Sequence, residues 1–373
     1  MTGNAPTVAG FRPLPASVYT DPAVLATELE RGFAGGWCGI GFASDVPNPG
    51  DVRPVTLAGR PLLMTRDRAG KLHVLHNVCR HRGLALVEQP CSAQKILRCP
   101  YHAWCYELDG ALKLTPYFDG EARSLPDADT RAATGLLPAR FGVFADVVFV
   151  NLDEQAPPFE TFIAPLADRW APYDLSLLRR DSVRDFHIAA NWKLVAENFL
   201  DGYHVPWTHS QVGGPETALG FEDTLIAPDL FGFHMPRGEA DKPKSAEPMP
   251  QQPNLPEHLR FAQDLVCVFP NTLLLMTPGW YQAILVQPDG AAASDERFAV
   301  WYMGDEAMTE ARTPQRSAFT AALERVNEQD LPILERLQRG RASPAADRLV
   351  FSPFWDGCGR NFHARVRRLL DVA

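Results

Sequence analysis

The chain has 373 residues, of which 46% are hydrophobic and 22% are charged, and its formal net charge is −9. This is a globular composition with enough length for two domains. The acidic balance and the lack of a basic stripe argue against nucleic-acid binding. No run of about 18 apolar residues predicts a membrane span, and no secretory signal opens the chain, so we expect a cytoplasmic protein.

The predicted elements change in character along the chain. Residues 18–37 have the spacing of an amphipathic helix. From residue 38 to 155, short alternating segments separated by Gly, Pro and Asp predict an antiparallel β domain. The acidic, proline-rich stretch 153–160 predicts a domain boundary. The second half is expected to contain a helix over 191–204, a long mobile loop over 234–258, strands over 265–276, 280–288 and 297–304, and a helix over 312–340 bent near Pro332.

Two short pairs of cysteine and histidine lie in the β domain. They are Cys79-x-His81 and Cys99-x-x-His102, with seventeen residues between them. Two kinds of site use two cysteines and two histidines, a zinc site and a Rieske [2Fe–2S] cluster with both histidines on one iron. Zinc-finger pairs usually join like residues, whereas each pair here is mixed. The pattern therefore favours the two-iron cluster over zinc.

A cluster of this kind moves one electron at a time and does not itself oxidise carbon. We therefore expect a second redox site in the more than 200 residues that follow it. His204 and His209 are five positions apart, and Pro206 is expected to end the helix so that His209 turns back toward His204. Asp201 lies three residues before His204, on the same predicted helical face.

A carboxylate for this second site is predicted on the late helix. Asp330 falls within the apolar stripe of that helix, where an ionised acid needs a partner or a metal. Two histidines and one carboxylate form the arrangement for non-haem Fe(II) and O₂. We therefore predict His204, His209 and Asp330 as iron ligands. The stripe consists of Leu323, Val326, Ile333, Leu334 and Leu337, and the acids expected to face water are Glu324, Glu328 and Glu335.

Both halves resemble the large α-subunit family of Rieske non-haem iron oxygenases, also called aromatic ring-hydroxylating oxygenases. The segments that carry the resemblance are "CRHRG", "CPYHAW", "NWKLVAENFLDGYHVPWTH" and "EQDLPILERLQRG". The resemblance implies an α+β fold, with an antiparallel Rieske domain at 38–155. It also implies a helix-grip (START-like) catalytic domain at 160–373, in which a curved antiparallel sheet wraps a helix. An N-terminal helical segment, 1–37, would pack on the catalytic domain.

The resemblance also implies a role for each site residue. Cys79, His81, Cys99 and His102 would hold the cluster. Asp201 would link His204 to His102 of a neighbouring subunit, which implies a homotrimer, and Asn198 would line the iron site. The chain would then be a terminal mono- or dioxygenase that hydroxylates or oxidatively demethylates a small organic substrate with O₂.

Electron supply and substrate are open at this point. Because no G-x-G-x-x-G follows a predicted strand, we expect a separate NAD(P)H-dependent reductase, with or without a ferredoxin. An aromatic substrate would use an apolar pocket with a cation such as Arg237. A quaternary ammonium substrate (choline, betaine or carnitine) would instead use an aromatic cage. Candidate cage walls are Trp207, Trp280, Tyr281 and Trp301.

Two further observations bear on function. Family members that act on choline-like amines tend to carry Glu where Asp201 stands, which favours the aromatic class. A non-enzymatic Rieske electron carrier is a third reading, but it would need broken iron ligands.

Overall fold

The computed structural model describes residues 11–212, 214, 219–236 and 249–372. The chain divides into two compact units, one formed by Phe33–Glu160 and the other by Met1–Gly32 together with Thr161–Ala373. Much of the predicted 234–258 loop, with Arg237, lies outside the described residues. Within the described residues, no helix is both long enough and apolar enough to cross a membrane.

The unit Phe33–Glu160 is built from three small antiparallel sheets. The turn between β2 and β3 has positive φ at both central residues, Ala58 (50°) and Gly59 (74°), which is the conformation that a two-residue hairpin requires. The three sheets have the orders β1 (Cys38–Phe42)–β9 (Val147–Asn151)–β8 (Arg140–Phe144), β2 (Val52–Leu57)–β3 (Arg60–Arg66)–β4 (Leu72–His76) and β5 (Leu97–Arg98)–β6 (Cys105–Tyr106)–β7 (Leu112–Leu114).

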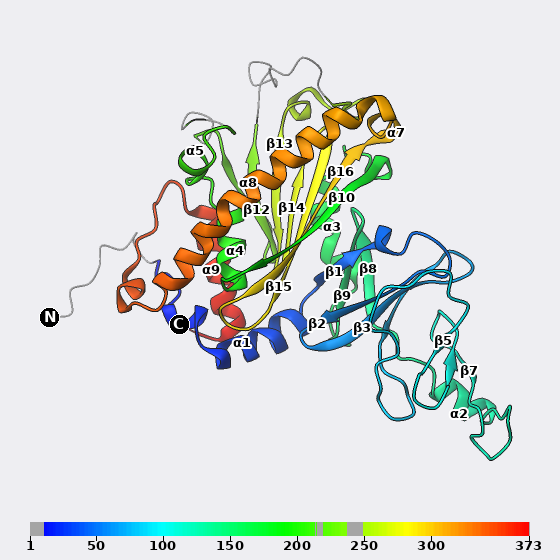
Figure 1. Ribbon diagram of the computed structural model, residues 1–373. Helices are drawn as coiled ribbons and strands as arrows, with labels where there is room; N and C mark the ends of the chain where they lie inside the picture. The colour runs from blue at the N-terminus through cyan, green and yellow to red at the C-terminus, as the bar shows by residue number, and fades with distance from the viewer. Residues whose placement is uncertain (1–10, 213, 215–218, 237–248, 373) are drawn as a thin grey trace. The chain divides into compact units, whose positions relative to one another are not determined.

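The other unit contains one seven-stranded antiparallel sheet with helices on it (Figure 1). Its strands, in spatial order, are β10 (Leu178–Ile188), β16 (Ser294–Met303), β15 (Trp280–Pro288), β14 (Thr272–Met276), β13 (Gln263–Val268), β12 (Leu230–Met235) and β11 (Glu222–Ala227). Its helices are α1 (Pro22–Glu28), α3 (Phe159–Arg169), α4 (Trp192–Phe199), α5 (Val205–Thr208), α7 (Gly304–Ala307), α8 (Thr313–Gly340) and α9 (Gly357–Leu370). The α+β fold predicted from the sequence is confirmed.

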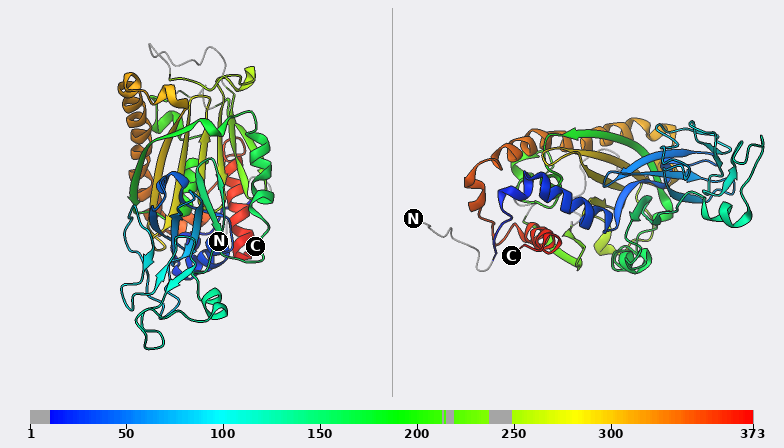
Figure 2. Two further views of the ribbon diagram at one scale, coloured as in Figure 1. Left: turned by 90° about the vertical axis from the view of Figure 1, so that its right-hand side faces the viewer. Right: turned by 90° about the horizontal axis from the view of Figure 1, so that it is seen from below.

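The alternation of side chains along β16 explains how helices cover both faces of this sheet. The Tyr302 hydroxyl lies 2.8 Å from the Thr320 hydroxyl on α8. The next side chain along the strand, Trp301, points the other way and packs on Tyr281, which contacts Trp170 just after α3. The helix α8 therefore crosses one face (Figure 1), and α3 leads into the other. The helix α1 lies beside α9 (Figure 2).

The predicted single helix over residues 18–37 is wrong. The segment contains a 3₁₀ turn at Ala16–Tyr19, then α1, then a π-helical turn at Leu29–Ala34. Pro22 has no N–H to continue the first turn, and the Asp21 side chain accepts a hydrogen bond from the Ala23 N–H, which starts a new helix.

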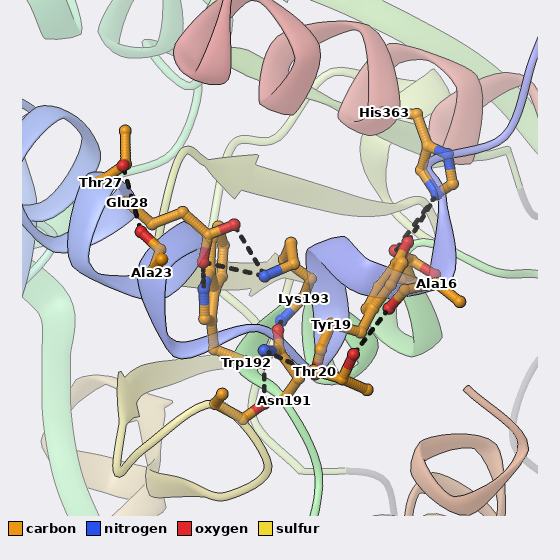
Figure 3. Close-up of polar contacts among 12 residues, drawn as sticks. Ala16, Tyr19, Thr20, Ala23, Thr27, Glu28, Asn191, Trp192, Lys193 and His363 are labelled. Atoms are coloured by element: carbon orange, nitrogen blue, oxygen red, sulfur yellow. Dashed lines mark hydrogen bonds and ion pairs between the residues drawn. The ribbon is translucent and has the colours of Figure 1, made fainter. Parts of the chain in front are cut away.

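A buried group of charges ties α1 to α4 (Figure 3). The Lys193 ammonium lies 2.7 and 2.9 Å from the two Glu28 carboxylate oxygens, and neither side chain is exposed. The Trp192 indole N–H donates to the same carboxylate at 2.9 Å. These contacts satisfy both charges, and removing one partner of such a pair leaves the other buried without compensation.

We expect Lys193→Met to lower the free energy of unfolding by about 3–5 kcal/mol, because Glu28 stays buried without its cation. The double variant Glu28→Gln/Lys193→Met should recover most of this loss. Urea unfolding followed by far-ultraviolet circular dichroism measures both. A loss below about 1 kcal/mol in the single variant would contradict this account of the pair.

Candidate metal centres

The two Cys–His pairs lie on two loops of nearly identical local structure. The Gly83 N–H donates to the Cys79 carbonyl at 2.9 Å, and the Ala103 N–H donates to the Cys99 carbonyl at 3.0 Å. In both loops this fourth residue after the cysteine has positive φ, 77° for Gly83 and 58° for Ala103. Each loop therefore closes on its cysteine carbonyl and holds the thiol in a fixed direction.

The four predicted cluster ligands are divided between the core and the surface. Cys79 and Cys99 are each 2% exposed and belong to the hydrophobic core, whereas His81 and His102 are exposed. The two imidazole rings lie 4.5 Å apart, and the buried Trp104 ring stacks on His81 at 4.9 Å. Two buried thiols and two adjacent exposed imidazoles fit a two-iron cluster with one sulfur-bound iron inside and one histidine-bound iron outside.

Tyr106 is a functional candidate that the sequence prediction missed. Its hydroxyl accepts a hydrogen bond from the Arg80 N–H at 3.0 Å and lies 3.4 Å from the Cys79 sulfur. Because the amide can only donate, the hydroxyl hydrogen is free to point at the sulfur. Burial, together with the hydrogen bond to Cys79, raises the pKa of Tyr106 far above its usual value, so the hydroxyl keeps its hydrogen.

The second predicted site lies between the end of α4 and the middle of α8. The expected helix over 191–204 is too long, because α4 ends at Phe199. The Asp201 carboxylate accepts a hydrogen bond from the Tyr203 N–H at 2.7 Å, which forms a turn in place of a further helical turn. His204 and His209 then flank the short helix α5, and Pro206 lies in the first turn of α5 instead of ending α4 as predicted. The centroids of the two imidazole rings are 5.2 Å apart.

The structure brings His204, His209 and Asp330 together. Their potential ligand atoms all lie within 4.8 Å of one another. The Asp330 Oδ1 is 3.0 Å from His209 Nε2 and 3.7 Å from His204 Nε2. His209 Nε2 and Asp330 Oδ1 are buried, and neither has a hydrogen-bond partner among the described residues. Buried polar atoms need partners, so a cation held by these donors fits the site.

The charges of the site attract positive charge. Burial alone lowers the pKa of His209, but the nearby Asp330 carboxylate and the contact with Gln329 outweigh burial and raise it. A second acid, Glu296, is buried on β16, and its carboxylate accepts a 2.6 Å hydrogen bond from Asn327. Burial, more than the charge of Asp330, raises the pKa of Glu296 to about 7. Near neutral pH, a substantial fraction of Glu296 is therefore protonated and carries no charge.

Two other predicted site residues, Asp201 and Asn198, make no hydrogen bond to the three proposed ligands. The Asp201 Oδ2 lies 3.4 Å from His204 Nδ1, and this nitrogen has no hydrogen-bond partner among the described residues. Asn198 is half-buried in the last turn of α4, and its side chain makes no hydrogen bond to another described residue. The roles of both residues stay predictions.

Two expectations about surrounding residues need correction. The stripe on α8 is less buried than predicted, since Leu337 is 44% exposed. The four aromatic residues do not form one cage. Tyr281 packs on Trp301 on one face of the sheet, and Trp280 contacts Phe319 on the opposite face. Trp207 is 71% exposed.

The catalytic half of the chain matches a known family. Residues 175–372 match the family described as ring hydroxylating alpha subunit (catalytic domain). The chain belongs to this family. Residues 36–126 match the Rieske [2Fe–2S] domain. The family resemblance seen in the sequence is thus confirmed, together with the Rieske cluster and mononuclear iron that this pair of domains implies.

Three curated relatives resemble different parts of the chain. The glycine betaine monooxygenase oxygenase subunit of Chromohalobacter salexigens is 35% identical over 58% of this chain and 46% of its own length. The anthranilate 1,2-dioxygenase large subunit of Acinetobacter baylyi is 33% identical over 52% and 41%. The carnitine monooxygenase oxygenase subunit of Escherichia coli K12 is 27% identical over 88% and 84%. The chain spans about half the length of the first two.

The fold of the whole chain is that of a solved quaternary ammonium Rieske monooxygenase. The TM-score is 0.77 over 100% of this chain and 99% of the other, with 20% sequence identity. The seven-stranded sheet with its helices, and the small antiparallel sheets of the Rieske unit, therefore follow a known architecture.

We expect Tyr106→Phe to lower the reduction potential of the cluster by about 40–90 mV, because a hydrogen bond to a cluster sulfur stabilises the reduced state by about 1–2 kcal/mol. A redox titration followed by the visible spectrum of the cluster measures the change. Tyr101→Phe is the control, since Tyr101 is 61% exposed. Equal potentials in wild type and Tyr106→Phe would contradict the assigned hydrogen bond.

Proposed function

We propose that the chain is the terminal oxygenase component of a multicomponent system and that it oxidises a small quaternary ammonium compound with O₂. One observation carries the reaction class. His204, His209 and Asp330 converge on one position, in the same chain as a Rieske domain. Iron held by two histidines and one carboxylate keeps open positions for O₂, and a Rieske cluster supplies single electrons.

The protein's own residues would act by orientation and by excluding water. His209 and Asp330 are 2% and 12% exposed at the side chain, so they hold the metal position away from bulk solvent. His204 is 19% exposed and lies on the side of Asp201. A substrate methyl group would have to approach from the side of His204, because the other two ligands, His209 and Asp330, are less exposed.

The substrate class rests on the relatives. The Chromohalobacter and Escherichia relatives are named for glycine betaine and carnitine, both quaternary ammonium compounds, and the second alignment covers most of this chain. These likenesses favour a quaternary ammonium substrate over the aromatic substrate that Asp201 suggested. An aromatic acid remains the second candidate, because the anthranilate relative is nearly as similar where it aligns.

Electrons would come from a separate protein. Two of the relatives are named as oxygenase subunits, which implies further components. Together with the lack of a dinucleotide-binding motif in the sequence, this supports an NAD(P)H-dependent reductase, with or without a ferredoxin.

The exposed surfaces around His102 and Asp201 support a homotrimer. In such a trimer, the cluster of one subunit would supply electrons to the iron of the next. His102 is exposed on the Rieske unit beside Tyr101, which is 61% exposed. Asp201 is 37% exposed at its side chain, and nearby Trp207 is 71% exposed. A head-to-tail contact between these two surfaces of neighbouring copies would form a closed ring and would let Asp201 join His204 to the partner's His102.

The substrate proposal predicts selective oxygen consumption. With NADH and a surrogate reductase, we expect O₂ uptake that depends on glycine betaine, carnitine or choline and not on anthranilate. Asp330→Ala should reduce substrate-dependent uptake to background while leaving the visible spectrum of the cluster unchanged. Uptake with anthranilate alone would shift the proposal to the aromatic class. Uptake retained by Asp330→Ala would contradict the iron site.

The ring arrangement predicts complementation between two inactive chains. Cys79→Ala removes a cluster ligand and Asp330→Ala removes an iron ligand, so each variant alone should be inactive. In trimers formed by equal co-expression, about a quarter of the chains would combine an intact iron site with an intact neighbouring cluster. We therefore expect about a quarter of wild-type activity. Activity no higher than that of either variant alone would contradict electron transfer between subunits.

A further inference from the structure

The two histidines of the proposed iron site are oriented by different neighbours. His204 Nδ1 faces Asp201 at 3.4 Å without a hydrogen bond. His209 Nδ1 lies 2.8 Å from the Oε1 atom of Gln329, the residue directly before Asp330 on α8. The orientation of His209 is therefore set by a direct contact, and that of His204 is set more loosely.

The Gln329 oxygen lies within hydrogen-bond distance of two nitrogen atoms. The Gln211 side-chain N–H₂ donates to the same Oε1 at 2.7 Å. Gln211 follows His209 by two residues, so one oxygen on α8 binds both the ring and the segment that carries it. The Gln329 side chain reaches this position from an exposed place on the helix.

The proposed iron site decides which end of the amide faces the ring. A carboxamide can present its oxygen or its NH₂ group, and hydrogen positions do not distinguish them. A metal at His209 Nε2 requires a lone pair on that nitrogen, so the ring hydrogen must be on Nδ1. A hydrogen on Nδ1 needs an acceptor, which the Gln329 oxygen provides and the NH₂ group does not.

We propose that Gln329 is the positioning residue for His209, and this inference rests on the proposed iron site. Its oxygen holds the hydrogen on Nδ1 and fixes the ring plane, so that Nε2 presents its lone pair toward Asp330, 3.0 Å away. Outer partners of this kind orient metal-binding imidazoles and strengthen them as ligands. Since Gln329 and Asp330 are adjacent, one turn of α8 both supplies the ligand Asp330 and orients the ligand His209.

Co(II) binding tests this role without relying on turnover. The full-length protein, with its cluster intact and mononuclear iron removed by chelation, is dialysed to equilibrium against Co(II), and bound metal is measured per chain. We expect one site in the wild type. Gln329→Leu should weaken Co(II) binding about 10-fold or more, because it removes the acceptor. Gln329→Glu, which can only accept, should bind within about 3-fold of wild type or more tightly.

Glu328→Leu is the matched control, since it makes a similar change at the neighbouring exposed position of α8 and should leave Co(II) affinity unchanged. Equal affinity of Gln329→Leu and wild type would overturn the proposal. So would a Glu variant as weak as the Leu variant, because that result would mean that the NH₂ group faces the ring. A wild-type chain that binds no Co(II) would overturn the iron site itself and this inference with it.

Discussion

The central physical constraint of this protein is a pair of buried polar atoms that face each other without hydrogen-bond partners among the described residues. His209 Nε2 and Asp330 Oδ1 lie 3.0 Å apart, and His204 Nε2 lies 3.7 Å from the same oxygen. Left unsatisfied, such atoms would cost about 1–3 kcal/mol each, and more for a charged carboxylate. A divalent cation satisfies all three donors at once. The break between α4 and α5 and the placement of α8 both serve to create this geometry.

Buried contacts at both ends of α4 help to hold the metal ligands in place. The buried pair of Glu28 and Lys193 fixes the start of α4 against α1. At the other end of α4, the Glu197 carboxylate accepts a hydrogen bond from the Tyr19 hydroxyl at 2.5 Å and pairs with His363 at 3.2 Å. The helix that leads into the metal site is thus held by charges from segments near both ends of the sequence. Loss of these contacts would loosen the ligands without removing any of them.

The sequence predicted the parts of the site that depend on local pattern. The Cys79 and Cys99 loops could be recognised because ligand, spacing and turn all lie within a few residues. Asp330 could be recognised because an acid in an apolar stripe needs a partner. The prediction of an aromatic cage was wrong because successive strand residues, such as Trp280 and Tyr281, face opposite sides of a sheet. Gln329 could not be found, since its contact with His209 spans 120 positions and leaves no local signal.

The most direct test of this account is the metal content of the purified full-length protein, measured as iron and acid-labile sulfide per chain and resolved by Mössbauer spectroscopy. We expect about three iron atoms and two sulfides, with one iron in a high-spin ferrous signal that is distinct from the exchange-coupled cluster pair. A chain that holds only the cluster pair after reconstitution with excess ferrous iron, or one that holds zinc instead, would contradict it.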